Sequence, residues 1–374
     1  MKSILLTTTA LVAFAGAAVA DGHTGVSFSG DFTLGFNDDS ENASTPIGDN
    51  NGFYWEGDLN VAGTMELDNG VTAGVTFEFD IVDQTTQQTT ISDLFVLSLT
   101  TETAGLYFGD TEYAAFSRWK AAGDMEADFF SEQDGETVLR GDVTVAGVGA
   151  SVSYQVGNQN VPAEQDANQL SIGAAGDVGM FSFSVAYQEE ADYVPESSDD
   201  FNSAEVFGVS VGTAVAGATL RLAYASNETT SETSSGIQVS YPFGPVTGTV
   251  YYVSEDDNNN DEDNYGVTVA YADGPFKVTL DYDYDQGVNK VGLDGAYDLG
   301  NGLTILAGVF DQSDDTTVAN NGTDTYVAAS YDLGGGAALL VSYADAEVAS
   351  NIADDEIGGP DYQVGTTVEV SFSF

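Results

Sequence analysis

The feature that most constrains this chain is an alternation of apolar with polar or small residues that continues along almost the whole sequence after Gly22. In residues 276–285, apolar side chains begin at Phe276 and recur at every second position, while Lys277 and Asp281 fall between them. A period of two is typical of a β-strand with one apolar and one polar face. No segment sustains the 3.6-residue period of an amphipathic helix, so the sequence predicts an all-β protein.

The connections between the alternating segments form two sets. Nine are tight turns rich in Gly or Asn, such as Asp68-Asn69-Gly70, and ten are other connections, most of them long and acidic. Gly and Asn supply the positive φ angles that hairpin turns require. Because the two sets strictly alternate, we predict one up-and-down antiparallel sheet with about twenty strand-like segments and a single domain.

Two architectures share this alternation: a soluble sandwich or β-solenoid with inward apolar faces, and an outer-membrane barrel with apolar faces toward lipid. Apolar stripes in strands of about ten residues suit a tilted membrane-spanning strand better than a soluble strand of about five or six. Aromatic residues such as Tyr54 and Trp55 gather at strand ends, as in membrane-interface girdles, although β-propensity alone also enriches them. Residues 92–100 are apolar on both faces and remain unassigned.

Basic residues within the strands keep to the polar face, which supports the membrane barrel. A Lys or Arg on the lipid side near the midplane would cost ~2–4 kcal/mol. The cations that would then line the interior wall are Arg140, Arg221, Lys277 and Lys290.

The first twenty residues have the pattern of a secretory signal peptide. Lys2 precedes an apolar stretch that ends in Ala18-Val19-Ala20, which fits cleavage after Ala20. A membrane anchor is the alternative, but the apolar core is too short for one. The mature chain would then be residues 21–374.

Composition excludes several functions. With 60 acidic and 7 basic residues, the net charge of -53 leaves too few cations to bind a nucleic-acid backbone. The absence of Cys removes disulfides, thiolate metal sites and Cys nucleophiles. A single histidine, His23, is a poor base for a hydrolase triad, so a barrel enzyme such as a lipase or protease is disfavoured.

The sequence resembles the general diffusion porins of the α-proteobacterial outer membrane, of the Rhodobacter type. The resemblance rests on the signal peptide, the segment 26–36, the segment 105–110 before a long acidic stretch, and the terminal Phe374. It implies a transmembrane antiparallel up-and-down β-barrel of sixteen strands, whereas the turn count allows eighteen to twenty. It further implies a homotrimer in the outer membrane, in contact with lipid and lipopolysaccharide. The last strand, with Val370, Phe372 and Phe374, would be the signal for the barrel assembly machinery.

The resemblance also implies that the longest connection, about residues 110–136, folds into the barrel and narrows it. Carboxylates in a pore favour cations, and facing Arg or Lys creates a transverse field. Our hypothesis is that acids of this loop face some of the wall cations; an ordinary solvated acidic loop is the alternative. The charged loop residues are Asp110, Glu112, Arg118, Lys120, Asp124, Glu126, Asp128, Glu132, Asp134 and Glu136.

We therefore expect a passive channel for small hydrophilic solutes and ions, with a preference for cations, no enzymatic activity and no cofactor. Ca²⁺ is a candidate partner of acidic outer loops such as 255–263, although no EF-hand spacing is present and a solvated loop explains the acids equally well. The alternative function is that of a secreted or surface Ca²⁺-binding β-protein, which would need repeats that the sequence lacks.

Overall fold

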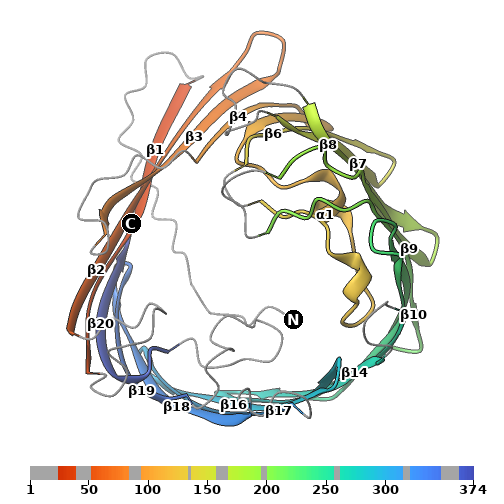
Figure 1. Cartoon of the computed structure of the whole chain (residues 1–374). Helices are drawn as coiled ribbons and strands as arrows, with labels where there is room; N and C mark the ends of the chain where they lie inside the picture. The colour runs from red at the N-terminus through yellow and green to blue at the C-terminus, as the bar shows by residue number, and fades with distance from the viewer. Residues whose placement is uncertain are drawn as a thin grey trace.

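The protein forms a barrel in the computed structural model (Figure 1). The structure describes residues 24–38, 52–83, 94–133, 136–156, 167–194, 200–256, 262–314, 321–346 and 362–374. Within these residues one sheet contains twenty antiparallel strands, each hydrogen-bonded to its neighbours in sequence. The strands are β1 Thr24–Asp38, β2 Gly52–Glu66, β3 Thr72–Asp83, β4 Phe95–Thr100, β5 Ala104–Gly109, β6 Val138–Val145, β7 Val148–Val156, β8 Ala167–Val178, β9 Phe181–Gln188, β10 Val206–Val215, β11 Ala218–Asn227, β12 Glu232–Phe243, β13 Val246–Asp256, β14 Asn264–Asp273, β15 Phe276–Asp285, β16 Val288–Gly300, β17 Leu303–Asp314, β18 Gly322–Gly334, β19 Ala337–Asp345 and β20 Gly365–Ser373.

The first and last strands close the barrel. β1 pairs with β20 from Asp31 opposite Ser373 to Asp38 opposite Thr366. Beyond that register, the backbones of Gly30 and Phe374 exchange two N–H···O bonds of 3.0 Å. The rings of Phe32 and Phe374 stack with centroids 6.0 Å apart. Among the described strands, closure gives every strand a neighbour on both sides, so the sheet has no edge strand.

The expected count of sixteen strands is wrong: the described residues contain twenty, the number that the turns indicate. Short turns connect the strands at one end of the barrel, the turn end, and the longer connections lie at the other, the loop end. Ala146-Gly147 and Ala216-Gly217 have positive φ at both positions. This is the type I′ geometry that matches strand twist in a two-residue hairpin.

The apolar stripes face outward around the barrel. On β11 the side chains of Leu222 and Tyr224 are exposed, whereas Ala223 and Ala225, which alternate with them, are buried inside. The faces of the unassigned segment, residues 92–100, can now be assigned from residue 94 onward. Leu97 and Leu99 are 45% and 46% exposed and point outward, while Val96 faces inward in a small recess shared with Thr76 and Glu78. On the inner face of β4, Val96 alternates with the polar Ser98 and Thr100, so the apolar inner residue of this strand is at its end near the loop residues Asp110 and Gln133.

Two features depart from a uniform cylinder. β4 and β5 have only 6 residues each. The long connection after β5 carries a short helix α1, Ala114–Arg118, and a 3₁₀ turn η1, Glu126–Asp128. Among the described residues, no helix has the length and apolar character needed to cross a bilayer.

Candidate constriction site

Residues 110–133 run inside the barrel along its inner wall rather than outward from the loop end (Figure 1). The wall holds α1 through serine hydroxyls. The N–H of Ala114 donates to Ser153 Oγ at 2.9 Å, and that of Ala115 to Ser171 Oγ at 2.7 Å. Helix N-termini leave such N–H groups without intrahelical partners. The wall of β7 and β8 therefore supplies the capping that the loop's own sequence lacks.

Glycines on the inner face make room for the loop. A Cβ on Gly173 would stand 2.2 Å from the Ala114 carbonyl oxygen, and one on Gly236 2.1 Å from that of Ala122. On Gly208 it would meet the Trp119 ring at 2.6 Å. The backbone of the loop can approach β8, β10 and β12 only because these positions carry no side chain.

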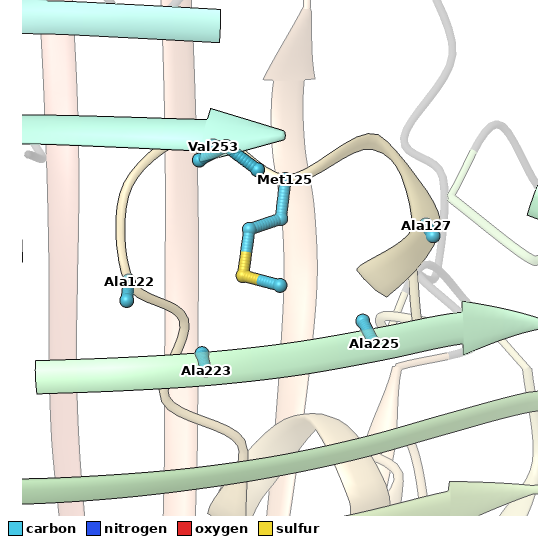
Figure 2. Close-up of a cluster of buried hydrophobic side chains, with 6 residues drawn as sticks. All are labelled: Ala122, Met125, Ala127, Ala223, Ala225 and Val253. Atoms are coloured by element: carbon cyan, nitrogen blue, oxygen red, sulfur yellow. The ribbon is translucent and has the colours of Figure 1, made fainter. Parts of the chain in front are cut away.

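Apolar contacts hold the middle of the loop to the wall. Figure 2 shows Met125 between Val253 on β13 and the small residues Ala223 and Ala225 on β11. Phe130 packs in a second cluster against Ala186 and Val206. Burying a side chain of the size of Met or Phe contributes roughly 1.5–3 kcal/mol. These contacts hold the loop against β9, β10, β11 and β13.

The two arginines of this region share one carboxylate on β6. Asp142 lies 3.2 Å from Arg140 Nε through Oδ1 and 3.9 Å from Arg118 Nη2 through Oδ2. Arg140 also lies 3.7 Å from Glu112 Oε2 and stacks 4.9 Å above the Tyr107 ring centroid. The loop acid Glu112 therefore faces the wall cation Arg140, and the loop cation Arg118 faces a wall acid.

At its far end the loop brings acids together near β14 and β15. Carboxylate oxygens of Asp124, Glu126 and Asp285 all lie within 4.8 Å of one another. The buried Asn264 donates through Nδ2 to Glu126 Oε1 at 3.2 Å. Asp285 also accepts from Lys290 Nζ at 3.1 Å. A second wall cation thus lies next to the loop acids, bridged by an acid of the wall.

The other charged residues of the loop take structural or exposed positions. Asp128 accepts from Trp119 Nε1 at 2.7 Å, and Asp110 from Gln133 Nε2 at 2.9 Å. The Glu132 N–H donates to the Asp200 carbonyl. Lys120 is exposed, Glu136 is buried, and Asp134 lies outside the described residues, as do Ala18, Ala20 and His23.

A buried tyrosine anchors the start of the loop. Tyr113 is fully buried against Val138 and Phe201. Burial raises the pKa of its hydroxyl, and the nearby Glu136 adds to the increase, so the phenol stays neutral.

The remaining two predicted wall cations lie away from the loop acids. Lys277 is exposed at the turn end of β15. Arg221 is half-buried on β11, and its Nη1 donates to Ser210 Oγ at 3.3 Å. For these two, the expected pairing with acids of the loop is absent among the described contacts.

The sequence reasoning missed an acidic row on the opposite wall. Asp31 is paired with Asp58, and Asp58 with Asp80, so three inward carboxylates lie side by side on β1, β2 and β3. These strands lie across the barrel from β10–β14 in Figure 1. The alternation could have revealed this row, because all three residues have the parity of the polar face.

The family comparison decides what this barrel is. The family profile of the Gram-negative porins matches residues 7–348. The chain belongs to the Gram-negative porin family. The predicted resemblance to porins is thus confirmed. This porin is an outer-membrane β-barrel channel for passive diffusion, not an enzyme.

Solved porin structures align with most of the chain at low sequence identity. An engineered triple variant of Rhodopseudomonas blastica porin is 16% identical with a TM-score of 0.47. A second triple variant of the same porin is 16% identical with a TM-score of 0.46. Each alignment covers 94% of this chain and 100% of the other. A search of curated protein sequences finds no significant match.

Proposed function

We propose that this porin conducts small hydrophilic solutes and ions with a preference for cations. The observation that carries the proposal is the imbalance of lumen charge. Arg118, Arg140 and Lys290 each lie within 4 Å of a carboxylate. The row of Asp31, Asp58 and Asp80 and the loop group of Asp124 and Glu126 add negative charge on both sides of the pore. Carboxylates that line a pore raise the local concentration of cations and oppose anions.

The proposal assigns the narrowing of the channel to the loop of residues 110–136. Its support is the position of residues 110–133 inside the barrel, fixed by wall serines, wall glycines and two apolar clusters. Charges in a narrow aqueous section act over a Debye length of about 8 Å at physiological salt. Acids on the loop are therefore placed where they influence a passing ion most.

Planar-bilayer recording of the purified protein tests this function. We expect stepwise channels whose reversal potential in a KCl gradient is shifted toward the equilibrium potential of potassium. An absence of stepwise conductance would contradict channel activity. Channels with an anion preference would contradict only the selectivity, and the assignment of the lumen acids would then be wrong.

The proposal includes assembly as a homotrimer, supported by the height of the wall at β4 and β5. Six residues at about 3.3 Å per residue, tilted by about 45°, span roughly 14 Å, less than the apolar band of ~25 Å of a membrane barrel. If only lipid surrounded β4 and β5, the height of the wall there would be much smaller than the thickness of the apolar layer. A second copy of the chain would cover it. A chemical cross-link between cysteines introduced at Leu97 on different subunits tests the contact.

We also propose that the barrel assembly machinery recognises the terminal strand and that the barrel contacts lipopolysaccharide. Ca²⁺ at the acidic outer loops also remains a prediction, and residues 257–261 of the 255–263 segment lie outside the described residues. The alternative of a secreted Ca²⁺-binding β-protein does not fit membership of the porin family.

A further inference from the structure

A recess of about 380 Å³ opens in the inner wall at Arg221. Asp177, Ser182, Gly212, Arg221 and Gln238 line it and form one row across five strands. The register pairs Asp177 with Ser182, Ser182 with Gly212, Gly212 with Arg221, and Arg221 with Gln238. Because paired residues share a face, all five point into the lumen. Gly212 has no side chain, and the hollow lies between Ser182 and Arg221.

This row lies directly on the turn side of the loop. Ser184 and Gly236 stand one inward position nearer the loop end than Ser182 and Gln238. Ser184 Oγ donates to the Arg118 carbonyl oxygen, and Gly236 lies beneath the Ala122 carbonyl. A solute that passes the loop toward the turn end therefore meets the recess next.

Arg221 brings a positive charge to the recess without an acid beside it. Among the described residues, the ion pairs of the barrel involve Arg118, Arg140 and Lys290, and none involves Arg221. Its hydrogen bond to Ser210 Oγ uses one of five guanidinium N–H donors. A planar guanidinium with free donors matches the geometry of a carboxylate. Half-burial makes that contact stronger than it would be in open water.

Asp177 gives the recess a negative charge on its other side. Three strand spacings separate the backbones of Asp177 and Arg221, roughly 14 Å at ~4.8 Å each. The long side chain of Arg221 and the short one of Asp177 therefore leave a gap of molecular size between opposite charges, with hydroxyl and amide groups along it. A simple anion must also pass the acids of the loop and of β1–β3, which repel it. A solute that carries both charges has no net charge, so these acids do not repel it overall.

We propose that the Arg221 recess binds small zwitterionic solutes of the amino-acid type. The carboxylate lies on Arg221 and the cationic group points toward Asp177. The inference rests on the proposed channel function and names a class of solute for which the channel has a binding site.

Three matched probes test the proposal: 4-aminobutyrate, butyrate and butylammonium. Each is added at increasing concentration to single channels in dilute KCl, and the reduction of current is measured after correction for bulk conductivity. We expect 4-aminobutyrate to reduce the current at the lowest concentration. Equal effects of 4-aminobutyrate and butyrate, or a stronger effect of butyrate, would overturn the zwitterion assignment.

The variants distinguish binding in the recess from a general effect of removing a charge from the lumen. Arg221→Gln should raise the concentration of 4-aminobutyrate needed for half-reduction by about tenfold, as expected for a lost charge-assisted contact. Asp177→Asn should move the preference toward butyrate. Lys277→Gln removes a cation at the same end of the barrel, outside the recess, and is the matched control. A variant Arg221→Gln that behaves like Lys277→Gln would refute the proposal.

Gly212→Val keeps both charges but fills the hollow, since even a Cβ there stands 2.5 Å from Ser182 Oγ. It should weaken the effect of 4-aminobutyrate as Arg221→Gln does, and an unchanged effect would count against the recess. Folding of every variant is checked by heat-modifiable gel migration. If no channels form with the parent protein, the proposed function fails. If channels form but the probes act alike, only this inference fails.

Discussion

The carboxylate of Glu112 on the loop and the guanidinium of Arg140 on β6 lie 3.7 Å apart, and the Glu112 carbonyl oxygen accepts a bond of 2.9 Å from the same Arg140 Nη1. The contact joins the start of the loop to the wall by both side chain and backbone. It also places the wall cation Arg140 next to two acids, Glu112 and Asp142.

Replacing Arg140 should increase cation preference. Arg140→Gln removes a positive charge, takes the cation away from Glu112 and leaves Asp142 with Arg118 alone, so the local field becomes more negative. We expect the potassium-to-chloride permeability ratio to rise by about twofold. The reversal potential in a KCl gradient measures it. An unchanged ratio with a folded barrel would show that this cluster lies off the ion path.

Neutralising the loop acids Asp124 and Glu126 should decrease the cation preference. The double substitution Asp124→Asn and Glu126→Gln removes two of the three clustered acids and should lower the permeability ratio by about twofold. Asp128 is left intact, because it holds Trp119 by a hydrogen bond. Glu102→Gln, in a short turn far from the loop, is the control of equal chemistry. Selectivity equal to that of the control would argue against a constriction at Asp124 and Glu126.

The position of the loop can be tested through the glycine beneath it. Gly236→Val places side-chain atoms where the Ala122 carbonyl oxygen now lies, so the loop must move away from β12. We expect noisier channels with altered conductance, while the barrel still folds. Gly248→Val, on the neighbouring strand, has open space around the new Cβ and should leave conductance unchanged. Identical recordings from both variants would contradict the packed position of the loop.

The outward assignment of the apolar stripe predicts an asymmetric cost along one strand. Leu280→Lys on β15 should destabilise the folded barrel by ~2–4 kcal/mol, because Leu280 faces lipid. Thr279→Lys, one residue away, faces the lumen and should cost little. Equilibrium refolding from urea into lipid vesicles measures both free energies. Equal costs would show that the two faces are not lipid and water.

The terminal ring contributes to barrel closure. Phe374→Ala removes the stack on Phe32 but keeps the two backbone bonds to Gly30. We expect less protein in the outer membrane, measured by membrane fractionation, with near-normal channels from the barrels that do form. Phe243→Ala changes an exposed aromatic side chain of the turn end that is far from the closing strands, so a similar loss there would remove any special role for Phe374.

The alternation predicted most of the barrel because lipid and water enforce opposite faces on every strand. Turn chemistry also predicted the number of strands better than the family resemblance did. The pair Gly176-Asp177 also has the composition of a tight turn, but it lies within β8, and the turn is at Gly179-Met180 because β8 continues to Val178. The faces of β4 could not be predicted, because the adjacent residues Val96 and Leu97 are both apolar although Val96 faces inward and Leu97 outward.

The site was less predictable because its geometry depends on where the loop rests. Charge alone could not show that Arg118 and Arg140 share Asp142, or that Arg221 is far from the acids of the loop. The wall did carry a signal that the reasoning passed over. Inward positions that are Gly or Ser on successive strands, such as Gly173, Ser184 and Gly208 on β8, β9 and β10, indicate that another segment packs against them.

Closure between β1 and β20 also bears on how the chain reaches its native state. Gly30 and Phe374 form partner hydrogen bonds although almost the entire sequence lies between them. One side of the first strand therefore stays unpaired until β20 has been synthesised. Contacts of such sequence separation slow folding, because much chain entropy is lost before they form. A chain truncated before β20 would retain two open edges, and we expect it to aggregate or be degraded rather than insert as a smaller pore.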